Sequence, residues 1–181
     1  MVFSPIPDFP RAPVLSLEEA AQLPRTGGPA ALPVRDRALE DAVAALSVKL
    51  GSRLLLPEAW SRLLPQAGVL VSSAISGGTL KERFQEAARA YSHRCWLFLE
   101  PMRMEFPLPC PTGTGTPVSA LSGHTSFYSD ALCCYYSHFI RENQGFMILW
   151  DTEETMAAKL ELARACGFSG WAAPENFLQY L

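Results

Sequence analysis

The chain has 181 residues, of which 49% are apolar and 18% charged, and its formal net charge is -3. Charged residues average about 25% of a globular chain, so this apolar balance indicates a surface that contacts another chain. The slight acidity and the lack of a Lys/Arg-rich run leave no electrostatic footprint for nucleic acid, and no apolar window approaches the roughly 18 residues of a membrane span.

Cysteine content and the first residues bear on the cellular compartment. Five cysteines at irregular spacing indicate reduced thiols rather than a disulfide framework. Residues 1–13 have neither the basic start nor the apolar segment of a signal peptide. Both observations predict a cytoplasmic protein.

Residues 1–34 are predicted to form a proline-rich arm, and residues 35–181 the folded domain. Seven prolines and a Gly-Gly pair in the arm disfavour long helices and the interior of a sheet. The exception is 16–23, where Ser16 as N-cap and Glu19 three residues later have the pattern of a capping box. We expect one short helix there.

After the arm, apolar residues recur at helical spacing from Leu39 to Leu50, and Gly51 ends the pattern. Residues 53–56 are a short strand candidate. Residues 57–64 begin with a proline, which suits the first turn of a helix. This segment therefore predicts a helix, a strand and a second helix.

The alternation then repeats more clearly. A strand is predicted over 68–74, a helix over 79–91 with Thr79 as its cap, and a buried strand over 94–100. Residues 101–123 are rich in proline, glycine and threonine, and we expect one long loop there.

The C-terminal part continues the pattern. Residues 131–139 and 145–150 are predicted to pair as a hairpin, and residues 152–166 to form a helix capped by Thr152. A last strand is expected over 169–173. Strands that alternate with helices predict parallel β/α units, and an eight-unit barrel takes roughly 250 residues. The sequence therefore predicts an α/β fold, a partial or degenerate TIM-type (β/α) barrel.

Residues 150–170, WDTEETMAAKLELARACGFSG, resemble the penultimate strand and helix of glycoside hydrolase family 18 barrels, especially their bacterial spore-associated branch. Residues 134–137, CYYS, lie where that branch often has a Pro-Tyr-Phe-Thr strand. The resemblance implies a relative from a bacterium that sporulates. Physically, Asp151 can cap the helix, and two of the glycines allow close packing of helix and strand. The matching positions are Asp151, Thr155, Ala157, Ala158, Lys159, Gly167 and Gly170.

The catalytic groups of that family have no counterpart in this chain. Family members carry Asp-x-x-Asp-x-Asp-x-Glu on the fourth strand, whose Glu protonates the leaving oxygen, and this spacing is missing from the sequence. The family's Tyr-Asp pair would fall near Ala74 and Ile75, and its floor tryptophan near Pro174. The resemblance therefore implies a non-catalytic barrel that binds carbohydrate or a protein partner.

Two carboxylates keep an enzymatic alternative open. Glu100 ends a predicted barrel strand on the side where such barrels bind ligands, and Glu105 follows five residues later. Such a pair can act as general acid and base, so the second hypothesis is a glycoside hydrolase acting on chitin-like or peptidoglycan glycans. Two charges that face water explain the same residues without chemistry.

Aromatic side chains are candidate substrate contacts because their rings can stack on sugars, although most aromatic residues at strand positions belong to a core. A third hypothesis is structural: a half-barrel completed by a second copy of itself, a homodimer whose monomer exposes an apolar sheet edge. The candidate substrate-binding residues are Arg103, Tyr135, Trp150 and Trp171.

Cysteine and histidine residues could gather around a metal, but their spacings match no zinc pattern, and adjacent cysteines on a strand point to opposite faces. We expect no metal site and no cofactor. A nucleophilic cysteine would need a base within hydrogen-bond reach, which spacing alone does not show. The residues concerned are Cys110, His124, Cys133, Cys134 and His138.

Overall fold

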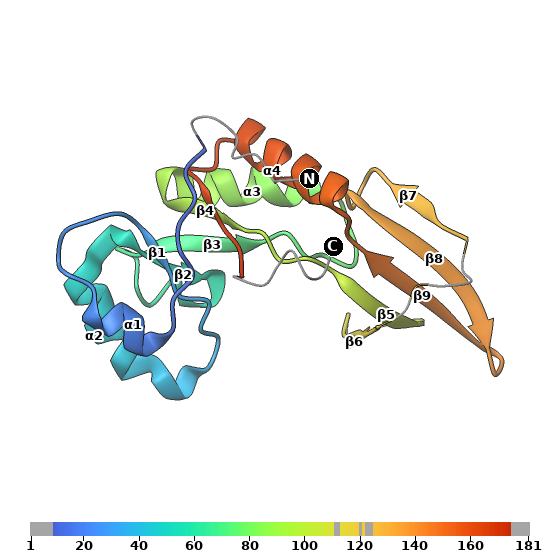
Figure 1. The fold of residues 1–181 in the computed structure, drawn as a ribbon, viewed down its shortest axis with the longest axis horizontal. Coiled ribbons are helices and arrows are strands. Elements are labelled where there is room, and N and C mark those ends of the chain that lie inside the picture. The colour runs from blue at the N-terminus through green and yellow to red at the C-terminus, as the bar shows by residue number, and fades with distance from the viewer. Residues whose placement is uncertain (1–8, 111–112, 120, 122–124, 175–181) are drawn as a thin grey trace.

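The computed structural model describes residues 9–110, 113–119, 121 and 125–174. These residues form two five-stranded sheets, one parallel and one antiparallel, which follow one another along the longest axis of the molecule (Figure 1). No helix in this part of the chain is both long and apolar enough to cross a membrane.

The parallel sheet has the strand order β1-β2-β3-β4-β10, and helices connect its strands. This arrangement confirms the predicted α/β fold with parallel β/α units. The whole antiparallel sheet is inserted between β4 and the helix that precedes β10. The strands are β1 (Ala30–Ala31), β2 (Leu54–Pro57), β3 (Gly68–Ser72), β4 (Cys95–Phe98) and β10 (Trp171–Ala172), and the helices are α1 (Leu17–Gln22), α2 (Glu40–Leu50), α3 (Leu80–Tyr91) and α4 (Glu153–Ala165).

The N-terminal arm joins the two edges of this sheet into a barrel. Ala12 N donates to Trp171 O at 2.8 Å on the β10 side, and Ala31 N donates to Pro13 O at 2.8 Å on the β1 side. The carbonyl of Pro10 likewise accepts from Trp171 N. Proline lacks an N–H but keeps its carbonyl, so the arm can pair with both edges despite its prolines. Both edges of the parallel sheet thus make hydrogen bonds to the arm of the same chain.

The barrel interior receives one buried apolar side chain from the arm and one from each strand. Small alanines stand at the arm and its two neighbouring strands, and large side chains stand on β2, β3 and β4. This graded packing fills a closed ring with fewer strands than the eight of a full barrel. The prediction of a partial β/α barrel is confirmed. The six interior residues are Ala12, Ala31, Leu55, Leu70, Phe98 and Ala172.

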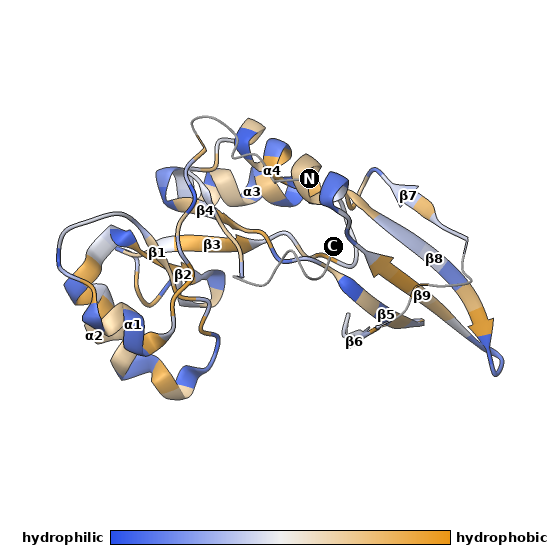
Figure 2. Ribbon diagram, in the orientation of Figure 1, coloured by the Kyte–Doolittle hydropathy of each residue, from blue (hydrophilic) through white to orange (hydrophobic). Residues whose placement is uncertain are grey.

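The outward faces of the strands are covered by helices in two groups. Leu54 and Leu56 of β2 pack with α1 and α2, and Val69 and Leu97 pack with α3 and α4. Figure 2 shows β3 as hydrophobic along its length, whereas α3 and α4 carry both hydrophobic and hydrophilic residues. A parallel strand that is covered on both faces is apolar along its length, and a helix that covers a sheet is apolar on one side only.

Local sequence signals fix several helix ends. The predicted capping box at α1 is present, with Ser16 Oγ accepting from Glu19 N at 3.2 Å. The predicted cap of α4 is also confirmed, because Thr152 accepts from Thr155 N. Thr79 precedes α3, but its side chain makes no capping hydrogen bond. The helix expected over 57–64 is a single 3-10 turn, Glu58–Trp60, followed by turns.

The antiparallel sheet has the order β6-β5-β9-β8-β7 and extends beyond the barrel on the side opposite α1 and α2 (Figure 1). The predicted hairpin is confirmed as β8 and β9, but the single loop expected over 101–123 is wrong. β5 and β6 lie within that range because β5 pairs with β9, about 40 residues later in the chain, and a pairing partner so distant leaves no local signal. These strands are β5 (Arg103–Leu108), β6 (Thr116–Pro117), β7 (Phe127–Ser129), β8 (Cys134–Arg141) and β9 (Gln144–Trp150).

A buried ion pair lies where the antiparallel sheet meets α4. Lys159 Nζ lies 2.7 Å from Asp151 Oδ1, and the two side chains are 1% and 0% exposed. Asp151 also accepts from Met102 N at 2.8 Å and from Thr155 Oγ1 at 2.8 Å. The resemblance left Asp151 as a second possible cap of α4, but Thr152, the cap predicted from the sequence, fills that position. Asp151 instead joins the strand connection at Met102 to the body of the helix.

Candidate functional site

Glu100 lies just beyond the carboxyl end of β4, as the sequence predicts. Its Oε2 accepts from Ser72 Oγ at 2.8 Å and pairs with Arg35 Nη2 at 3.2 Å, and one third of its side chain is exposed. Its backbone is also held, because Ser73 Oγ lies 3.0 Å from Glu100 N. The carboxylate therefore accepts from two donors at the C-terminal end of the barrel strands.

Glu105 lies on the antiparallel sheet and has a different partner. Its Oε1 is 2.7 Å from Arg141 Nη2, and its side chain is 14% exposed. A glycosidase needs two carboxylates that flank one scissile bond. Glu100 lies in the connection between β4 and β5, whereas Glu105 lies within β5, and each pairs with a different arginine.

Three of the other predicted site residues, Arg103, Trp150 and Tyr135, fall into one row across the antiparallel sheet, which Tyr128 extends. Arg103 of β5 is in register with Trp150 of β9, Trp150 with Tyr135 of β8, and Tyr135 with Tyr128 of β7. Directly opposed residues on antiparallel strands share a face, so all four side chains lie side by side. We call this set the aromatic row. Glu105, two residues from Arg103, lies on the same face.

The rings of the aromatic row are in contact. Tyr135 and Trp150 stack with centroids 6.0 Å apart and planes inclined by 20°, and Tyr128 meets Tyr135 edge-on at 5.4 Å. Arg103 Nη2 donates to Ser119 O at 2.9 Å, on the side of Trp150 away from Tyr135. Such pairs present a broad apolar surface with polar atoms at its edges.

A pocket of about 360 Å³ opens beside these rings, between the aromatic row and the start of α4. We call it the aromatic pocket. Its lining includes hydroxyl and carboxylate groups, the half-buried ring of Tyr135 and the edge of Trp150, which is 8% exposed. Neither Glu100 nor Glu105 lines it. The lining residues are Ser126, Tyr135, Trp150, Thr152, Glu153 and Glu154.

Trp171, the remaining candidate substrate contact, lies elsewhere. It is 4% exposed and packs in the core between the barrel strands and the helices α3 and α4. The guanidinium carbon of Arg11 lies 5.2 Å from its ring. The structure therefore separates Trp171 from Tyr135 and Trp150 and gives it a packing position.

Among the described cysteine and histidine candidates, Cys134 and His138 are too far apart to form a catalytic pair. They share one face of β8 but are four residues apart, a rise of roughly 13 Å along a strand, which exceeds hydrogen-bond reach. Burial raises the pKa of the Cys134 thiol to about 12 and also raises the pKa of Cys133. His124 lies outside the described residues. Within the described part of the chain, no group of three or more His, Cys, Asp or Glu side chains could hold a metal ion.

The same burial predicts which thiols are unreactive. Cys95 and Cys134 are fully buried, and desolvation raises the pKa of each thiol to about 12. Because the thiolate is the reactive form, we expect both to stay unmodified by iodoacetamide at neutral pH in the folded chain, and all five cysteines to react after unfolding in urea. Peptide mass spectrometry measures this. Rapid labelling of Cys134 in the folded chain would contradict the burial described here.

Two of the six lining residues were predicted as ligand contacts from the sequence. Tyr135 and Trp150 were candidates because of their rings, whereas Thr152 was predicted only as a helix cap, and Glu153 and Glu154 only as part of the helix over 152–166. The missing information was the register between β8 and β9, which sets both rings beside the start of α4. Ser126 had no signal, because β7 was not predicted.

No protein-family model matches the chain, and no curated protein matches it. Solved structures with a partly similar arrangement include the spore cortex-lytic enzymes SleL of Bacillus megaterium QM B1551 (TM-score 0.48, 13% identity, 75% of this chain and 42% of that chain) and of Bacillus cereus (0.48, 11%, 76% and 42%). Another is ydhD of Bacillus subtilis, assigned as a sporulation-specific glycosylase (0.48, 12%, 81% and 64%). The chain spans less than two thirds of each of these proteins, and likeness at this level does not transfer an activity.

Proposed function

We propose that this chain is a non-catalytic binding protein that holds a sugar ring in the aromatic pocket. The observation that carries the proposal is the stacked pair of Tyr135 and Trp150 beside a rim of hydroxyl and carboxylate groups. The C–H face of a sugar packs on an aromatic ring, and its hydroxyls need hydrogen-bond partners at the ring edge. The pocket offers both kinds of contact.

The positions of the carboxylates support binding rather than hydrolysis. Glu100, in the connection after β4, and Glu105, on β5, are each engaged with a different arginine, and neither lines the aromatic pocket. The resemblance of residues 150–170 to family 18 glycoside hydrolases fits this proposal, because framework positions are retained where the acid signature is missing. Asp151, Thr155 and Lys159 among them form the buried contact at α4.

Binding is tested by calorimetry with chitin oligosaccharides and with peptidoglycan fragments. We expect Tyr135→Ala to weaken binding by about tenfold or more, since loss of an anchoring aromatic side chain typically costs more than 1 kcal/mol. Phe139→Ala is the matched control: Phe139 lies on the same face of β8, four residues along, and does not line the pocket. Circular dichroism verifies that both variants fold.

Two results would overturn this proposal. Binding that is equal in Tyr135→Ala and the unaltered chain would place the ligand elsewhere. Release of reducing ends from either glycan by the purified chain, lost in Glu100→Gln, would show a hydrolase instead of a binding protein.

A further inference from the structure

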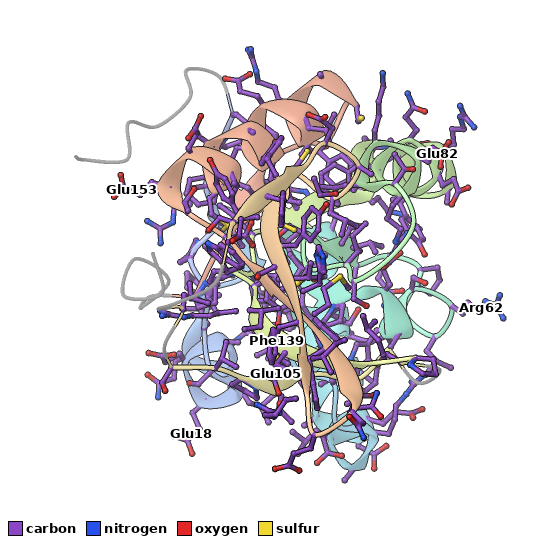
Figure 3. The ribbon with its side chains drawn as sticks, turned by 90° about the vertical axis from the view of Figure 1, so that its right-hand side faces the viewer. Glu18, Arg62, Glu82, Glu105, Phe139 and Glu153 are labelled. Carbon is purple, nitrogen blue, oxygen red and sulfur yellow. The ribbon has the colours of Figure 1, made fainter. Side chains whose placement is uncertain are left out.

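The aromatic pocket has an uneven distribution of charge. Two of its lining residues, Glu153 and Glu154, are carboxylates, and none is a lysine or an arginine. Both glutamates are exposed, and neither takes part in an ion pair within the described residues. Figure 3 shows Glu153 at the outer end of α4, directed away from the helix.

The nearest cations of the surrounding elements are directed to other partners. Lys159 of α4 is fully buried against Asp151, and Arg164 pairs with Glu161 near the far end of that helix. Arg103 of β5 is bonded to Ser119 O on the other side of Trp150. The two carboxylates therefore face the pocket without a positive neighbour from the described residues.

Helix stability accounts for part of this arrangement, because acidic residues in a first turn interact favourably with the helix dipole. The helix dipole explains why acidic residues occur in the first turn of α4. It does not explain why a stacked Tyr-Trp pair lies beside them. Aromatic faces attract cations within about 6 Å of the ring, and adjacent carboxylates add to that attraction. Rings and carboxylates together favour a positively charged group over a neutral one.

Building on the proposed function, we infer that the aromatic pocket selects sugars that carry a free, protonated amine over their N-acetylated counterparts. The ring of a glucosamine-type unit packs on Tyr135 beside the exposed edge of Trp150, and its ammonium lies between these rings and the carboxylates of Glu153 and Glu154. Acetylation removes the charge and adds bulk where the carboxylates stand. Partly deacetylated chitin or peptidoglycan has the chemistry that this pocket recognises.

The test compares glucosamine oligosaccharides with N-acetylglucosamine oligosaccharides of the same length, by calorimetry at about pH 5.5, where carboxylates are mostly ionised and the amines of the amino sugar are largely protonated. We expect about three- to tenfold tighter binding of the amino form, from a cation–π contact and exposed ion pairs. The preference should shrink as sodium chloride is raised, because salt screens exposed charges.

The double variant Glu153→Gln and Glu154→Gln removes the ion pairs but keeps the rings, so its preference for the amine should fall to about twofold or less. Its matched control is Glu82→Gln, which removes a first-turn glutamate from α3, outside the pocket and on the other helix (Figure 3). The control should keep the preference for the amine.

The possible results separate the two proposals. If neither oligosaccharide binds, the sugar-binding function fails. If both bind equally, or the N-acetylated form binds more tightly, sugar binding stands and the amine preference is wrong. A preference that is undiminished in the double variant would assign it to groups other than these carboxylates and would also overturn the inference.

Discussion

Replacing Lys159 with methionine is expected to lower the free energy of unfolding by about 3–5 kcal/mol, the range found when one partner of a buried ion pair is removed. Lys159 and Asp151 are 1% and 0% exposed, so water cannot replace the lost ammonium. The Asp151 carboxylate would keep its bonds from Met102 N and Thr155 Oγ1 but would be left as an uncompensated buried charge. Urea unfolding followed by circular dichroism measures the loss.

Two controls separate the buried pair from a general effect of losing a lysine. Lys81→Met removes an exposed lysine from α3, and such surface changes usually stay within about 0.5 kcal/mol. Asp151→Asn combined with Lys159→Met removes both charges together, and should recover part of the stability that the single change loses. A loss below about 1 kcal/mol for Lys159→Met would show that water reaches Asp151 and that the pair is not sealed.

The residues of this ion pair could be found from a sequence motif, but their structural role could not. Asp151, Thr155 and Lys159 stood out as matching positions, and their spacing of four residues along a helix places them on one face. Their partner, the backbone N–H of Met102, could not be found, because it lies 49 residues earlier in the chain. A motif can therefore mark residues that act together while leaving their role open.

Elements with strong local signals were predictable, and elements defined by distant pairing were not. The helix α1 has its capping box and α2 ends at Gly51, so both follow from neighbouring residues. β5 contains Pro107 and pairs with β9, so its own sequence looked like a loop. The short strand β1 is two alanines, and only its position beside β2 and the arm makes it a strand.

The candidate site was also predictable only in part: residue type suggested its members, and long-range strand pairing decided which of them are neighbours. Tyr135, Trp150 and Arg103 were each plausible contacts from residue type alone, and the register across β5, β9 and β8 shows that they are neighbours. Trp171 was equally plausible from residue type, but its strand lies in the barrel, where its ring is buried by α3 and α4. Which face of which sheet a residue occupies depends on long-range pairing, which a single sequence does not contain.

Gly170→Ala is expected to destabilise the chain by about 2–3 kcal/mol, near the upper end of the usual cost of overpacking. A Cβ at this position would overlap a ring carbon of Trp96 and lie 2.5 Å from Pro10 O. Pro10 belongs to the arm, and its carbonyl accepts from Trp171 N, so the backbone cannot give way without weakening the contact that closes the barrel. The expected result is a lower midpoint in urea and faster proteolysis of the arm.

Gly77→Ala provides the control for this closure, because a Cβ there meets nothing within 4 Å and the backbone is not in the left-handed region. This change should be neutral or slightly stabilising, since alanine restricts the unfolded chain more than glycine does. The midpoint and the proteolysis of the arm should move together in Gly170→Ala. If the midpoint falls while the arm stays protected, the cost arises at Trp96 alone, and the arm closes the barrel independently of Gly170.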